Sequence, residues 1–128
     1  MIEKKINIEG KEMTLRASAL IPILYRTWFG RDLIRDMRKI SQAYKELMSL
    51  PDDATDEEKL DAQYATIDTQ LFADVAWTML KHGGEDVGSN SEDWLSSLDG
   101  IFTLYEILPD VLDLWSQNNK TTAVPRKK

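Results

Sequence analysis

Residues 5–37 read KINIEGKEMTLRASALIPILYRTWFGRDLIRDM, and they contain the clearest change of hydrophobic period in the chain. Apolar and polar side chains alternate over residues 6–8 and again over residues 13–15, which is typical of strands with one buried face. The tripeptide Glu-Gly-Lys at residues 9–11 lies between these runs and suits a tight turn. We therefore predict a β-hairpin over residues 4–16, with helices after it.

Two helices joined by a glycine are predicted next. Ser18 is a natural N-cap, and Pro22 falls in the first helical turn, where its missing N–H costs least. Gly30 suits the left-handed position that ends a helix, and Asp32 can cap the helix that follows. The second helix carries one apolar stripe in which residues recur every three or four positions. The stripe consists of Leu33, Ile34, Met37, Ile40, Tyr44, Leu47 and Met48.

A capping box marks the start of a third helix, because the Thr55 hydroxyl can accept the Glu58 N–H while the Glu58 carboxylate reaches back. Apolar residues then recur at helical spacing until Gly83, so we expect one continuous helix that is buried along much of its length. Its apolar residues are Leu60, Tyr64, Ile67, Leu71, Phe72, Val75, Ala76, Met79 and Leu80.

The last third of the chain begins with a polar, glycine-rich loop that runs to Ser91. A short helix around Trp94 is predicted after this loop, and a final apolar stripe over residues 101–115 predicts the last helix. Pro109 lies inside that stripe and should kink the helix, because proline removes a backbone donor and clashes with the preceding turn.

These signals predict a mainly α fold of the α+β class, in which an N-terminal β-hairpin precedes a bundle of about four to five helices. The chain has 128 residues, which is the size of one ordinary domain, and 42% of its residues are hydrophobic. We place a single helical domain at residues 1–119. Residues 120–128 have no apolar period and are predicted to form a flexible basic tail.

Catalytic and metal-binding motifs were sought and none is expected. The chain has no cysteine, and its one histidine, His82, has no second histidine or thiol with which to bind a metal. The glycines over residues 83–89 resemble a phosphate-binding loop only in spacing, because Ser89 replaces the required lysine and a helix precedes them. Paired carboxylates such as Asp110 and Asp113 have no visible nucleophile beside them. We expect no enzyme activity and no cofactor.

Charge is distributed unevenly along the chain, whose net charge is −6. Residues 1–48 contain ten Lys or Arg against six Asp or Glu, whereas residues 49–119 contain two against sixteen. An acidic second half repels phosphate backbones and disfavours nucleic-acid binding. Either the two halves pair within one fold, or the basic half of one copy contacts the acidic half of another, and charge alone leaves both open. No apolar run reaches the ~18 residues of a membrane span.

Three short motifs carry a resemblance to a known family. They are LRASA at residues 15–19, LYR at residues 24–26 and FGRD at residues 29–32, which an apolar helix follows. With the hairpin in front, this pattern resembles the start of the small tail assembly chaperones of long-tailed (siphovirus-type) bacteriophages and prophages. The match covers about a third of the chain. Beyond residue 50 the agreement is one of size, helical character and acidity.

The resemblance implies a non-enzymatic chaperone of virion morphogenesis. Proteins of this family coat the long helical tape measure protein, recruit tail tube (major tail) subunits around it, and leave before the virion is complete. The implied location is therefore the bacterial host cytoplasm and not the mature virion. The implied partners are the tape measure protein, the tail tube protein and further copies of the chain, in a ring or a helical coat.

Two groups of side chains are candidates for partner binding or self-association. The aromatic group would supply apolar contacts, although aromatic residues on a periodic stripe also pack in cores. The basic group would form a rim that meets acidic residues of a neighbouring copy, or else a solvated helix face. The aromatic candidates are Trp28, Phe29, Trp94 and Trp115, and the basic candidates are Arg26, Arg31, Arg35 and Arg38.

A second interpretation of the same sequence is a helical adaptor or regulatory domain of the host cell that binds one protein partner without assembling. A third, an enzyme that uses only carboxylates, has little support. Neighbouring genes separate the first two, because a phage tail protein would be encoded beside a major tail protein and a very long helical protein.

Overall fold

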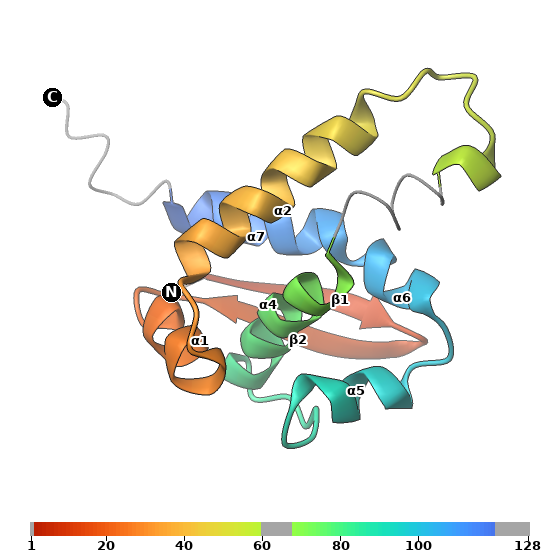
Figure 1. Cartoon of the computed structure of the whole chain (residues 1–128). Helices are drawn as coiled ribbons and strands as arrows, with labels where there is room; N and C mark the ends of the chain where they lie inside the picture. Colours follow the sequence, from red (N-terminus) through yellow and green to blue (C-terminus); the bar gives the residue numbers. More distant parts are fainter. Residues whose placement is uncertain (1, 60–67, 120–128) are drawn as a thin grey trace, which may run out of the picture.

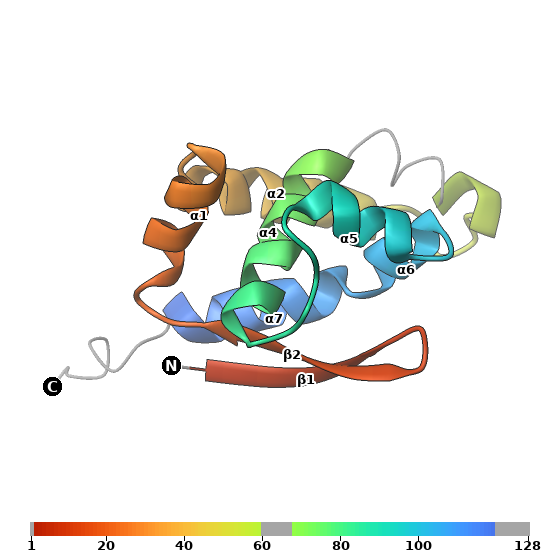
Figure 2. The same ribbon diagram turned by 90° about the horizontal axis from the view of Figure 1, so that it is seen from below.

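A computed structural model of the chain describes residues 2–59 and 68–119 and has the predicted class, a mainly helical α+β fold. An antiparallel hairpin is followed by about six helices, which all lie on one side of the hairpin (Figure 1, Figure 2). The elements are β1 (Ile2–Ile8), β2 (Lys11–Ala17), α1 (Ile21–Phe29), α2 (Leu33–Met48), α4 (Thr69–His82), α5 (Ser91–Ser97), α6 (Ile101–Glu106) and α7 (Leu108–Asn119).

The hairpin confirms the prediction for residues 4–16 and extends it to residues 2 and 17. Its turn has two central residues, Glu9 and Gly10, with φ of 53° and 86°, and this positive-φ pair matches the twist of the flanking strands. The Asn7 side chain accepts the Gly10 N–H at 2.8 Å. The face toward the helices is apolar and consists of Ile6, Ile8, Met13, Leu15 and Ala17.

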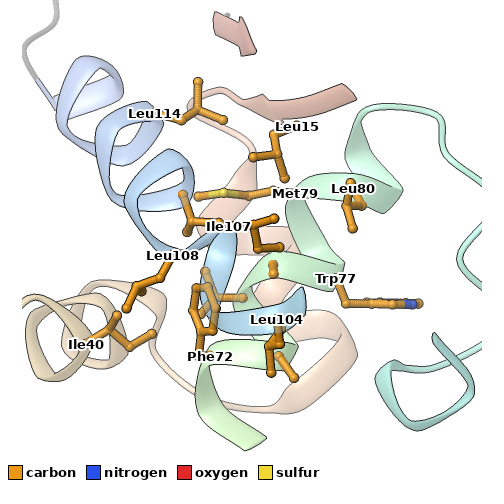
Figure 3. Close-up of a cluster of buried hydrophobic side chains, with 14 of the residues drawn as sticks. Leu15, Ile40, Phe72, Trp77, Met79, Leu80, Leu104, Ile107, Leu108 and Leu114 are labelled. Atoms are coloured by element: carbon orange, nitrogen blue, oxygen red, sulfur yellow. The ribbon is translucent and has the colours of Figure 1, made fainter. Parts of the chain in front are cut away.

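Helix α4 is the centre of the structure, since every residue from Leu71 to Leu80 is buried. It packs against β2 on one side and against α1, α2 and α5 on others, and α7 covers both strands beside it. Figure 3 shows side chains of α4, α6 and α7 converging on one apolar cluster, with Leu15 from the hairpin and Ile40 from α2. Burial along α4 was predicted from its apolar spacing.

The prediction of one helix from the capping box to residue 82 is wrong. The box itself is confirmed, with the Glu58 N–H donating to Thr55 Oγ1 at 3.1 Å and the Thr55 N–H donating to Glu58 at 2.8 Å. Residues 56–59 are helical, but Asp68 is extended and its carboxylate accepts the Leu71 N–H, so α4 starts afresh at Thr69. The predicted stripe residues 60, 64 and 67 lie outside the described residues.

The last helix is interrupted rather than kinked. Ile107 separates α6 from α7. Its N–H donates to the Leu104 carbonyl at the end of α6, and its own carbonyl accepts the Val111 N–H at the start of α7. Pro109 therefore lies in the first turn of α7, where a proline needs no hydrogen-bond acceptor. The apolar spacing of the sequence continues through both helices and therefore gives no sign of this break.

Two further details correct the sequence predictions. Ser18 is not the N-cap of α1; that position belongs to Leu20, which makes no side-chain cap bond. Ile34 and Met48 do not belong to the buried stripe of α2, since their side chains are 52% and 64% exposed. By contrast, Gly30 is left-handed with φ of 71°, and Asp32 caps α2 through the Ile34 and Arg35 N–H groups, as predicted.

Across residues 2–59 and 68–119, no helix is both long enough and apolar enough to cross a membrane.

The close crossing of α4 over β2 generates a first prediction. A Cβ at Gly83 would lie 2.3 Å from the Thr14 carbonyl oxygen, and backbone cannot move aside as a flexible side chain does. We expect Gly83→Ala to lower the free energy of unfolding by about 1–3 kcal/mol, measured by urea denaturation. Gly100→Ala is the control, because nothing lies within 4 Å of its Cβ position. Equal stability of the two variants would contradict this packing.

Candidate functional site

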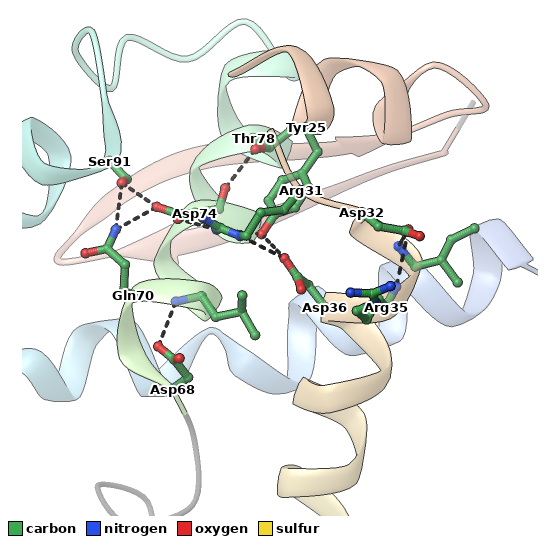
Figure 4. Close-up of polar contacts among 12 residues, drawn as sticks. Tyr25, Arg31, Asp32, Arg35, Asp36, Asp68, Gln70, Asp74, Thr78 and Ser91 are labelled. Atoms are coloured by element: carbon green, nitrogen blue, oxygen red, sulfur yellow. Dashed lines mark hydrogen bonds and ion pairs between the residues drawn. The ribbon is translucent and has the colours of Figure 1, made fainter. Parts of the chain in front are cut away.

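A network of buried polar side chains joins four helices at one point (Figure 4). Arg31, in the loop between α1 and α2, donates to Asp36 of α2 at 3.0 Å and to Asp74 of α4 at 2.5 Å. Both carboxylates are almost fully buried, with side chains 4% and 2% exposed. One guanidinium therefore compensates two buried acids, which would otherwise be costly to desolvate.

Neutral donors complete this network. The Tyr25 hydroxyl of α1 donates to Asp36 at 2.6 Å, and burial together with this hydrogen bond raises the pKa of Tyr25 above its ordinary value. Asp74 also accepts from Ser91 of α5 at 2.6 Å and from Gln70 at 2.8 Å. No buried side-chain polar atom in the described ranges lacks a partner. The network fixes the positions of helices and presents no free reacting group.

Ser18 and His82 form a pairing that resembles part of a catalytic site. Ser18 Oγ lies 3.0 Å from His82 Nε2, between the end of β2 and the end of α4. Burial lowers the pKa of His82 below its ordinary value, and repulsion from Arg16 lowers it further. However, no carboxylate of the described chain bonds to His82, so the group that orients the base in a triad is missing. The pair ties the hairpin to α4.

The surface of α1 is unusual because large apolar side chains face solvent along it. Leu20 at its N-cap and Ile23 are 46% and 61% exposed, and their spacing of three places them on one helix face. Trp28, five residues beyond Ile23 and therefore on a different face of the helix, is 39% exposed, and its ring packs edge-on against Trp77 with centroids 5.1 Å apart. A fixed, exposed aromatic on the same helix as exposed aliphatic side chains is typical of a protein-binding surface.

The other aromatic candidates are more buried than Trp28. Phe29 is half-buried between Tyr25 and Trp77, at ring distances of 5.3 and 5.7 Å. Trp94 is only 4% exposed and belongs to the core, and Trp115 packs partly buried against it. Of the four aromatic candidates, Trp28 is thus the one whose ring the fold leaves substantially exposed.

The four arginine candidates separate into two kinds. Arg31 makes its ion pairs inside the fold, so it has a structural task. Arg26, Arg35 and Arg38 are exposed and form no ion pair with any described residue. A hollow of about 330 Å³ at the junction of α1 and α2 brings together Arg26, Gly30, Arg31, Asp32, Arg35, Asp36 and Lys39.

Sequence reasoning missed the partners of Arg31 in the network, Asp74 among them, and Lys39 of the hollow. Asp74 lies 43 residues from Arg31, and no local pattern marks it as the partner. Lys39 follows Arg35 by one helical turn, and that spacing was the available signal for the hollow.

Comparison with known proteins adds no identification: no family model, curated protein or solved structure matches the chain. Within the described ranges, no group of three or more histidine, cysteine, aspartate or glutamate side chains could hold a metal ion.

The network generates a second prediction. Arg31→Met leaves Asp36 and Asp74 buried without their cation, so we expect a loss of about 3–5 kcal/mol in the free energy of unfolding. Arg35→Met, with the same chemical change at an exposed position, should change stability by less than about 0.5 kcal/mol. Chemical denaturation of both variants is the measurement. A stable Arg31→Met protein would show that the two acids are not held by this cation.

His82 generates a prediction on pH. Because its folded pKa is lowered, the unfolded chain binds a proton more readily once the pH falls below about 6.5, and stability is lost as the pH drops toward the folded pKa. Above the unfolded pKa, neither the folded nor the unfolded chain binds this proton appreciably, so His82 adds no pH dependence there. We expect His82→Gln to remove this component, so that the stability difference between wild type and variant narrows or reverses from pH 7.5 to pH 5.5. Thermal melts across that range test it; parallel pH curves would contradict it.

Proposed function

We propose that this protein is a non-enzymatic tail assembly chaperone of a long-tailed bacteriophage or prophage. It would bind the tape measure protein in the host cytoplasm, recruit tail tube subunits and depart before the virion is complete. The motifs at residues 15–32 support this proposal, because they resemble that family and build the hairpin end, α1 and the glycine junction.

The observation that carries the proposal is the exposed apolar surface of α1, which Leu20 and Ile23 form on one face and Trp28 on another. A tape measure protein presents long helices whose apolar faces need cover before assembly. A partner helix can lay its apolar residues against such a face, with anchors at helical spacing. The described chain offers this surface on a helix whose position the Arg31 network holds.

The second candidate, a host adaptor that binds one helical partner, can use the same surface of α1. The two proposals differ in the genes beside this one and in the identity of the partner. A major tail protein upstream and a very long helical protein downstream are expected for the phage function.

The test is co-expression of the affinity-tagged chain with that downstream protein, followed by co-purification. We expect a complex with the wild-type chain and at least about a tenfold weaker one with Ile23→Asp, because the charge must be desolvated at the contact. Ile23→Leu should retain binding, and Gln42→Asp, on the exposed side of α2, controls for added charge. Undiminished co-purification of Ile23→Asp would remove the α1 face from the proposal, and absence of a complex would remove the function.

A further inference from the structure

Opposite charges gather near the two ends of helix α2. At its N-terminal end, the hollow of about 330 Å³ gathers Arg26, Arg35 and Lys39, three exposed cations that make no ion pair with another described residue. Arg31 adds a fourth cation to the lining. Asp32 and Asp36 also line the hollow, but Asp32 caps α2 and Asp36 is held by Tyr25 and Arg31. The cations of the hollow thus outnumber its acids.

The segment after α2 has the reverse character. Residues 52–58, which we call the acidic arm, include five acids and no base, and all five are exposed. Figure 1 places this arm at the end of α2 away from α1. The five acids are Asp52, Asp53, Asp56, Glu57 and Glu58.

The two charged groups do not meet within one molecule. The macrodipole of α2 is already matched by its own charges, since Asp32 caps its N-terminus and Lys45 lies in its last turn. The 16 residues of α2 span about 24 Å, so its ends cannot meet in one copy. Cations and acids that lie this far apart in one copy can pair between two copies.

Exposed apolar side chains accompany the charges at both ends. Ile34 is 52% exposed beside the hollow's Arg35, and Met48 is 64% exposed just before the arm. They are the two residues of α2 among the large apolar side chains that remain exposed. An apolar centre bordered by polar and charged groups is the usual composition of an interface.

We propose that the basic hollow of one copy binds the acidic arm of a second copy, head to tail. The hollow cations pair with the arm carboxylates, and Ile34 of one copy lies against Met48 of the other. Such contacts are heterologous, so they close into a ring or continue as a helical chain. The biological role of this assembly rests on the proposed function, but the contact belongs to this chain alone and is tested without any other protein.

Sedimentation velocity of the wild-type chain is the first measurement. We expect concentration-dependent oligomers at low salt that dissociate at high salt, since partly exposed ion pairs are screened. A monomer at high protein concentration in low salt would overturn the proposal, and oligomers indifferent to salt would overturn the ionic contact.

Charge reversal gives the decisive experiment. Arg26→Glu with Arg35→Glu makes the hollow acidic, and Asp52→Lys with Asp53→Lys reduces the net charge of the arm from −5 to −1, so each variant alone should lose the contact. An equimolar mixture should assemble again, because the intact arm of the first variant meets the intact hollow of the second. Circular dichroism melts verify that both variants are folded.

A matched control separates this contact from net charge. Glu92→Lys with Glu106→Lys makes the same charge change as the arm variant at two exposed acids elsewhere, and it should assemble like the wild type. If this control also becomes monomeric, or if the mixture of the two reversed variants stays monomeric, the hollow and the arm are not the contact. Either result leaves binding to a tape measure protein as a separate question.

Discussion

The Arg31 guanidinium, shared between two buried carboxylates, is the interaction on which the positions of the helices depend. Asp36 and Asp74 come from α2 and α4, and each would destabilise the fold if buried alone. Arg31 can reach both carboxylates only if the loop after α1 occupies one position against α4. Tyr25 attaches α1 to Asp36, and Ser91 attaches α5 to Asp74. Because α1 is fixed in this way, its exposed apolar side chains have a defined orientation.

The hairpin depends on the C-terminal part of the chain, although it is the most recognisable local feature. A two-stranded hairpin is marginal in water, and this one is stabilised by α4 and α7. Gly83 allows α4 to approach Thr14 closely, and Lys4 reaches Asp110 and Asp113 of α7 at 3.1 and 2.9 Å. Some bases of the first half therefore meet acids of the second within one fold, and Arg31 with Asp74 is the buried example.

Local signals were predictable from sequence, and the long-range pairings were not. Gly30, Asp32 and the Thr55 capping box act within a few residues, so their chemistry is visible in the order of amino acids. The break before α4 was missed because an apolar period continues through a helix start that Asp68 alone marks. Likewise, Trp94 was a surface candidate by type, and only the packing of α5 decides that its ring is buried.

The predicted partner-binding residues are sorted by a single criterion, namely whether the fold already uses them. Arg31 and Trp94 already have contacts inside the molecule. Arg26 and Arg35 are exposed without a paired acid in the described chain, and Ile23 is exposed without apolar cover. Unused charge and unused apolar surface adjoin on α1, because Arg26 follows Ile23 by three residues and the two therefore share a helix face. A surface of this composition suits a protein partner that offers an apolar patch bordered by acids.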